Sequence, residues 1–166
     1  MSAMRKTIHV VAVLAWALWM GGFTFFTAVS LRVAHRVLDD PGDFGFVTQT
    51  VTDRLNIIGL VAVVLLLAQL TSHWRILASR PRFAMTCTWL TLAITLGLMF
   101  LQHNQIDGLL DFQQRLVTDR DAFERVHDRY EMTATIQWLA AVVHLAVMLT
   151  VAGVRSPIAA GDVDGR

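Results

Sequence analysis

Four long apolar stretches, at residues 8–30, 55–74, 83–101 and 133–154, occupy about half of this 166-residue chain. At ~1.5 Å of rise per residue, a helix of about 20 residues crosses the ~30 Å hydrocarbon core of a bilayer. Each stretch is therefore long enough to be a transmembrane helix. The sequence predicts an all-α fold, a four-transmembrane-helix bundle that forms a single domain over residues 1–156.

The composition supports a membrane protein. Hydrophobic residues make up 55% of the chain and charged residues only 16%, too few charges for the surface of a soluble domain. The net charge is +1, and the arginines are spread over every loop, so no basic face indicates a nucleic-acid partner. The expected partner is the lipid bilayer, with a homo-oligomer or other membrane proteins as further candidates.

The charges around the stretches predict an orientation. Arg5 and Lys6 precede residues 8–30 as in a signal peptide, but the stretch is longer than the ~7–15 residues of a signal h-region, so we expect a retained first helix. The 14 Lys and Arg residues divide evenly between the two sides. The short link from Arg75 to Arg82, however, carries three arginines and no acid, which is typical of a cytoplasmic loop. We expect a multi-pass protein of the bacterial inner membrane with both termini cytoplasmic.

The helical pattern continues past two of the stretches on the outward side. The first and fourth helices are expected to extend beyond the membrane, and Asp43 begins a short separate amphipathic segment before the second helix. Asp121 and Glu124 have the spacing of a capping box that starts the fourth helix. The tail at residues 157–166 is expected to be disordered. The predicted helices span about residues 7–38, 54–75, 83–103 and 122–154, with a short amphipathic helix at about 105–117 in an extramembrane cap.

Small and aromatic residues in the first helix predict how it packs. Ala17 and Gly21 have the small-x-x-x-small spacing that lets two helices approach closely. Trp16 and Trp19 fall near mid-bilayer, where their indole N–H groups need partners. We expect both tryptophans to be structural.

Histidines and acids gather in the outward layer. Glu124 and His127 have the three-residue spacing of one half of a carboxylate-bridged metal site, but a complete site needs that motif twice. Two interpretations remain: a site for copper or another divalent metal, or a solvated face paired with arginines. The candidate metal ligands are His35, His103, His127, Glu124, Asp107 and Glu131.

His144 stands apart because it lies within the fourth apolar stretch, where an ionisable side chain is costly and is a candidate for function. It indicates either an axial haem ligand, with His9 as the other candidate, or a neutral histidine hydrogen-bonded to Gln137 or to a neighbouring helix. A b-type haem needs two ligands that face each other, and no partner at the depth of His144 is evident. No cofactor is expected, and a metal ion or haem is the alternative.

Two segments carry a resemblance. The first is WALWMGGFTFF at residues 16–26, and the second is Phe123-x-x-x-His127-x-x-Tyr130 followed by Thr135-x-Gln137-Trp138. Over about residues 8–154 the chain resembles the transmembrane protein 205-like family, whose members are small four-helix integral membrane proteins. His9, Trp16 and the Gly21-Gly22 pair also resemble the opening of copper-resistance membrane domains and of membrane-bound protoporphyrinogen oxidases, although the glycine pair comes one turn later here. That second resemblance implies His9 as a ligand.

The sequence contains no nucleophile triad, phosphate-binding loop or complete metal motif. It therefore predicts an integral membrane protein that is not an enzyme. The alternative function is metal handling, or a haem-binding membrane oxidoreductase, through the outward histidines or the histidine inside the bundle.

Overall fold

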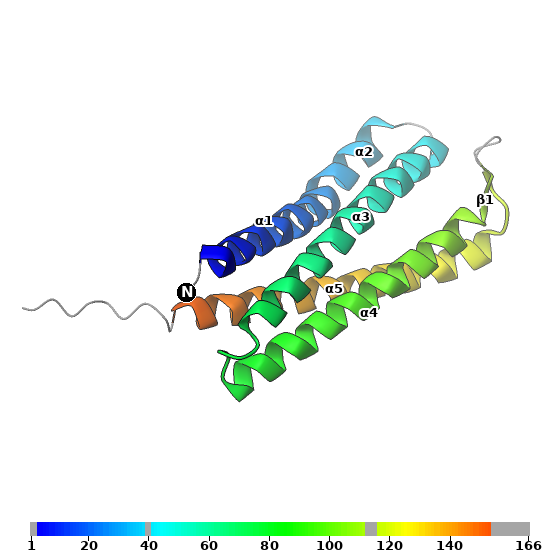
Figure 1. Ribbon diagram of the computed structural model, residues 1–166. Helices are drawn as coiled ribbons and strands as arrows, with labels where there is room; N and C mark the ends of the chain where they lie inside the picture. Colours follow the sequence, from blue (N-terminus) through cyan, green and yellow to red (C-terminus); the bar gives the residue numbers. More distant parts are fainter. Residues whose placement is uncertain (1–2, 39–40, 112–115, 154–166) are drawn as a thin grey trace, which may run out of the picture.

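The computed structural model describes residues 3–38, 41–111 and 116–153, and the described chain is a bundle of four helical rods (Figure 1). The first rod is continuous through three elements. Its π-helical turn, η1, separates two α-helices. The elements are α1 (Ala3–Phe25), η1 (Phe26–Ser30), α2 (Leu31–Val37), α3 (Pro41–His73), α4 (Ser79–Asp107), β1 (Leu110–Asp111), β2 (Leu116–Val117) and α5 (Arg120–Gly153). The predicted all-α class is confirmed.

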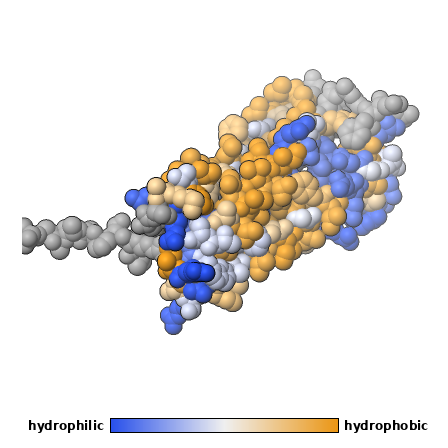
Figure 2. Space-filling view, viewed as in Figure 1, coloured by the Kyte–Doolittle hydropathy of each residue, from blue (hydrophilic) through white to orange (hydrophobic). Residues whose placement is uncertain are grey.

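The four rods are long and apolar enough to cross a membrane. Large apolar side chains on their outer faces are exposed, among them Leu14 at 63% and Ile94 at 61%. Figure 2 shows an apolar band between two more polar ends. A soluble protein rarely exposes so large an apolar surface, so the molecule is compatible with a multi-pass integral membrane protein.

The rods form two antiparallel pairs. The first rod packs mainly on α3, α5 packs mainly on α4, and the contact between α3 and α4 joins the pairs. One end of the bundle holds the start of α1 and the link between α3 and α4; we call it the terminal end (Figure 1). The other holds the start of α3 and the two short strands; we call it the hairpin end.

Two tryptophans of α1 contact the neighbouring helices α5 and α3. The Trp16 indole N–H donates to the carbonyl of Ala141 on α5 at 3.1 Å, which gives it the structural partner expected of it. Trp19 is only 1% exposed and lies against Gly59 of α3. A Cβ at Gly59 would stand 2.5 Å from Trp19 Nε1, so only glycine leaves room for the indole. Close approach occurs here and not at the predicted Ala17–Gly21 pair, because Gly21 is exposed and a Cβ there would meet nothing within 4 Å.

The second and third predicted helices are longer than expected. Helix α3 runs unbroken for 33 residues from Pro41, so the predicted separate segment after Asp43 is its first part. Proline suits the first turn of a helix because its missing N–H would have no intrahelical partner there. Helix α4 has 29 residues and ends at Asp107. At ~1.5 Å per residue, all four rods are longer than the ~30 Å hydrocarbon core of a bilayer. The prediction that only the first and fourth helices extend beyond the membrane is therefore wrong.

The predicted helix at 105–117 is also wrong. After Gly108 the chain forms the antiparallel pair β1–β2, in which Leu110 faces Val117. The Thr118 N–H donates to the Leu109 carbonyl at 2.9 Å and closes this hairpin. Short apolar runs suit a strand as well as a helix, and α4 ends at its C-cap, Gly108, before the pattern can continue.

Helix α5 begins at Arg120, one residue before the predicted capping box. Asp119 Oδ1 accepts the N–H of Ala122 at 2.9 Å, so Asp119 is the N-cap. Glu124 instead accepts from Arg120 Nε at 2.9 Å. The Asp121–Glu124 capping box is therefore wrong. The tail predicted at 157–166 lies outside the described residues.

Candidate functional site

A pocket of about 500 Å³ lies in the hairpin half of the bundle, between the first rod and α5. Helix α3 supplies its third wall. Both apolar rings and polar side chains line it: Phe23, Thr24, Phe26, Thr27, Leu31, Thr48, Thr52, His127, Tyr130, Glu131, Ala134, Thr135 and Trp138.

Helical spacing explains which side chains reach the pocket. On α5 they recur at intervals of three and four residues, from His127 to Trp138, which puts them on one stripe of the helix. Thr48 and Thr52 are four apart on α3 in the same way. The space between the rods remains because the first rod packs mainly on α3 and α5 mainly on α4.

The π-helix η1 forms part of the pocket wall. The Leu31 N–H bonds to the carbonyl of Phe26, five residues earlier, which widens this turn by one residue. Phe26, at the start of η1, is 7% exposed, and Thr27 follows it on the pocket wall. Single π-turns of this kind occur frequently at functional sites.

Two polar contacts define the pocket surface. His127 Nδ1 lies 3.5 Å from Glu131 Oε1, one turn further along α5, and the ring of Phe123 stacks on the imidazole at 5.7 Å. Deeper in the bundle, Trp138 Nε1 donates to Thr24 Oγ1 at 3.1 Å. That bond links α5 directly to α1 beside the pocket.

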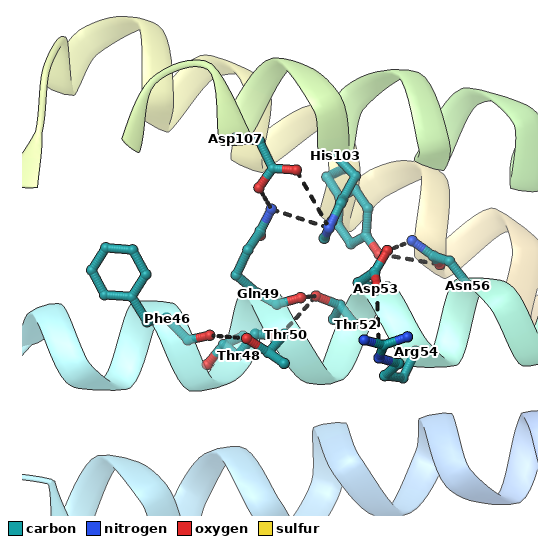
Figure 3. A network of polar contacts seen from close by, with 11 residues as sticks. Phe46, Thr48, Gln49, Thr50, Thr52, Asp53, Arg54, Asn56, His103 and Asp107 are labelled. Atoms are coloured by element: carbon teal, nitrogen blue, oxygen red, sulfur yellow. Dashed lines mark hydrogen bonds and ion pairs between the residues drawn. The ribbon is translucent and has the colours of Figure 1, made fainter. Parts of the chain in front are cut away.

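A polar network behind the pocket joins α3 to α4 (Figure 3). The Gln49 amide nitrogen contacts both the Asp107 carboxylate and His103 Nε2, the latter at 3.1 Å. His103 is 5% exposed and lies 4.0 Å from Asp107. Because an amide nitrogen has two protons, Gln49 can donate to both neighbours. The lone pair of His103 Nε2 is then occupied.

The network continues to a pocket residue. Asn56 Nδ2 donates to the Tyr130 hydroxyl at 3.2 Å, and the His103 ring lies 6.4 Å from that of Tyr130. Tyr130 is 8% exposed and belongs to the pocket lining. The polar contacts among α3, α4 and α5 therefore hold one wall of the pocket in position.

The six predicted metal ligands comprise two close pairs, His103 with Asp107 and His127 with Glu131, and two residues with other partners. His35 packs edge-on against Phe44 at 5.6 Å, Glu124 pairs with Arg120, and His127 pairs with Glu131. Asp107 and His103 share Gln49. Across residues 3–38, 41–111 and 116–153, no three His, Cys, Asp or Glu side chains form a group that could hold a metal ion. The outward histidines do not assemble into one site.

The two haem candidates are likewise not paired with each other. His144 is fully buried, and its Nδ1 lies 2.7 Å from Thr88 Oγ1 on α4. This matches the predicted hydrogen bond to a neighbouring helix, with Thr88 rather than Gln137 as the partner. His9 Nδ1 instead lies 2.8 Å from Gln69 Nε2 on α3.

The sequence indicates only the α5 side of the pocket. The stripe on α5 follows from helical spacing, and its His127 and Glu131 were candidate residues. The threonines of the first rod and of α3 were missed, because a threonine on a predicted helix does not indicate which neighbouring helix it faces. The two segments that carry the family resemblance lie on opposite sides of this pocket, at Phe23–Phe26 and at His127–Trp138. No protein-family model, curated protein or solved structure matches the chain.

Proposed function

We propose that this protein is an integral membrane protein that binds an amphiphilic molecule from the lipid phase in the pocket between the first rod and α5. The observation that carries the proposal is the gradient along α5. His127 and Glu131 line the pocket toward the hairpin end, and Ala134 and Trp138 line it deeper in the bundle. A molecule with a polar end and an apolar body matches that order.

The size and access of the pocket support binding. A volume of about 500 Å³ falls in the range of small-molecule sites. Glu131 is 68% exposed at its side chain and Trp138 is 37% exposed, so the pocket reaches the outer face of the bundle at both levels. An amphiphile could therefore enter sideways, with its apolar part still in lipid.

The orientation that we propose puts this pocket near the outer surface of a bacterial inner membrane. The link between α3 and α4 contains Arg75 and no acid, and Arg80 and Arg82 follow in the first turn of α4, as in a short cytoplasmic loop. The hairpin end then faces outward. The resemblance to the transmembrane protein 205-like family supports a membrane location, and we propose membership in that family.

Filling the pocket tests the proposed function. We expect Thr135→Trp to block it, because Thr135 lines the pocket and is exposed at its edge. Wild-type protein in nanodiscs made from a bacterial lipid extract should retain a bound amphiphile when examined by native mass spectrometry. The Thr135→Trp variant should lose most of that bound mass.

The neighbouring residue provides the control. Ile136 is 45% exposed but does not line the pocket, so Ile136→Trp adds the same side chain one position away. It should retain the amphiphile as wild type does. Circular dichroism verifies that both variants are helical. Equal retention by wild type and Thr135→Trp, or no retained molecule in wild type, would contradict the proposed function.

A further inference from the structure

We infer that the pocket selects amphiphiles whose polar end is a hydrogen-bond donor with positive charge, such as a long-chain amine. This inference rests on the proposed function and adds the class of ligand. It follows from which hydrogen-bonding atoms of the pocket are already used and which remain open.

The threonines offer the pocket acceptors, not donors. The Thr48 hydroxyl donates to the Phe44 carbonyl at 2.8 Å, and the Thr52 hydroxyl donates to the Thr48 carbonyl at 2.8 Å. A hydroxyl has one proton and two lone pairs. With the proton given to its own helix, each oxygen has lone pairs left for a ligand.

The same holds on the other two walls. The Thr27 hydroxyl donates to the Phe23 carbonyl at 3.0 Å, and the Thr135 hydroxyl donates to the Glu131 carbonyl at 2.9 Å. All three rods around the pocket therefore present threonine oxygens as acceptors. A ligand with N–H or O–H groups can satisfy them, but a ligand with only acceptors cannot.

Two strong donors of the pocket are already engaged. The Trp138 indole N–H is bonded to Thr24 Oγ1 at 3.1 Å. The Tyr130 hydroxyl proton is directed at Asn56 Oδ1 at 3.4 Å, while the same hydroxyl accepts from the Asn56 amide. An anionic headgroup needs such donors, and these two can serve it only if their existing bonds break.

The charge of the pocket lining also favours a positively charged ligand. Glu131 is the acidic residue of the pocket, and none of the described residues that line it is Lys or Arg. His127, 3.5 Å from Glu131, is the titratable neighbour. With a neutral imidazole the pair has one negative charge, and with a charged imidazole it is neutral. The pair is thus never net positive.

The aromatic side chains of the pocket lining also favour a cationic ligand. Phe23, Phe26, Tyr130 and Trp138 line the pocket together. The face of an aromatic ring attracts a cation, most strongly for Trp and when water is excluded. An ammonium group beside the Glu131 carboxylate therefore lies in a lining that also carries threonine oxygens and aromatic rings.

Three probes with the same chain separate these preferences. Hexadecylamine, hexadecanol and hexadecyl sulfate are added at equal low mole fractions to phosphatidylcholine nanodiscs that hold the full chain, and native mass spectrometry measures the occupancy of each. We expect the amine to exceed the sulfate roughly five- to tenfold, as one partly exposed charge contact with cation–π support predicts. The alcohol should fall between them.

A matched pair of variants assigns the charge preference to the pocket. Glu131→Gln should remove most of the advantage of the amine over the alcohol. Glu124→Gln removes a carboxylate from the same helix, one that is paired with Arg120 and does not line the pocket, and should change nothing.

The outcomes separate the inference from the proposed function. Equal occupancy by all three probes, or a preference for the sulfate, would overturn the ligand class while binding itself stands. Glu124→Gln acting as strongly as Glu131→Gln would also overturn it. Failure of wild type to bind any of the three probes would instead remove the proposed function.

Discussion

His144 depends on one hydroxyl for its hydrogen bond. Its ring is 0% exposed in α5, and Nδ1 lies 2.7 Å from Thr88 Oγ1, while Nε2 has no hydrogen-bond partner in the described part of the chain. A buried polar atom without a partner costs ~1–3 kcal/mol. The Thr88 contact therefore fixes how α4 and α5 lie against each other at this depth.

Removal of that hydroxyl should weaken the bundle. We expect Thr88→Val, which keeps the shape of the side chain, to lower the free energy of unfolding by ~1 kcal/mol, because hydrogen bonds between membrane helices average below that value and an unpaired imidazole nitrogen adds to the loss. Unfolding by sodium dodecyl sulfate in mixed micelles, followed by circular dichroism, measures the change.

The control for this experiment lies one turn away. The Thr91 hydroxyl donates only to the Cys87 carbonyl of its own helix at 3.0 Å, so Thr91→Val removes a hydroxyl without affecting a second helix. It should change the free energy of unfolding much less. Equal effects of the two variants would show that Thr88 contributes only within α4.

At the scale of helices, the packing of α1 on α3 depends on one glycine. A Cβ at Gly59 would lie 2.5 Å from Nε1 and 2.6 Å from Cε2 of Trp19, and the indole is rigid and buried. We expect Gly59→Ala to lower the free energy of unfolding by ~1–3 kcal/mol, the usual cost of overpacking. The same detergent titration measures it.

Gly97 of α4 supplies the comparison. It lies in the same kind of apolar stretch, but a Cβ there would meet nothing within 4 Å. Gly97→Ala should be neutral or slightly stabilising, since alanine is a better helix former than glycine by ~1 kcal/mol. A loss of stability in Gly97→Ala that matches the loss in Gly59→Ala would mean that contact with Trp19 does not account for the loss at Gly59.

These two glycines also mark how far the sequence could predict the fold. The four helices follow from apolar length, because a bilayer requires every backbone group within it to be bonded inside the segment. Gly59 and Gly97 look alike in the sequence, and only the packing of α1 on α3 distinguishes them. Helix ends were harder to predict because the polar hairpin end has no such constraint, and there the sequence missed the continuous α3 and the β1–β2 hairpin.

The candidate site, too, could be predicted from the sequence only in part. The stripe of His127 and Glu131 could be predicted because both lie on one helix. Its facing wall could not, since Thr27 and Thr48 reach the pocket only through the arrangement of three rods. The predicted metal cluster required side chains of different rods to converge, and the structure gives His35 and His103 separate partners.

Across the described part of the molecule, polar contacts between side chains of different rods occur at both ends of the bundle. Gln69 meets His9 at the terminal end, and Gln49 meets His103 and Asp107 at the hairpin end. Between them the rods are joined by apolar packing, by indole bonds to carbonyls such as that of Trp89 Nε1 to Val63 at 2.9 Å, and by paired polar side chains such as Thr88 and His144. This distribution is the one expected if the apolar band lies in lipid, where unpaired polar groups are costly.

The last prediction concerns the orientation of the protein in the membrane. In a Cys87→Ala background, single cysteines are introduced at Ser79, near the link between α3 and α4, and at Thr118, beside β2; both positions are exposed. A membrane-impermeant maleimide should label Thr118→Cys in intact bacterial cells and Ser79→Cys only after lysis. The reason is the arginine-rich, acid-free link, which is retained on the cytoplasmic side.

Each other labelling pattern has a distinct meaning. Labelling of Ser79→Cys alone in intact cells would reverse the orientation and put the pocket near the cytoplasmic surface, where its ligand would come from the inner leaflet. Labelling of both positions in intact cells would contradict membrane crossing by α4, because one span of the bilayer must separate its two ends. The expected pattern instead puts Glu131 and its threonine neighbours within reach of amphiphiles in the outer leaflet.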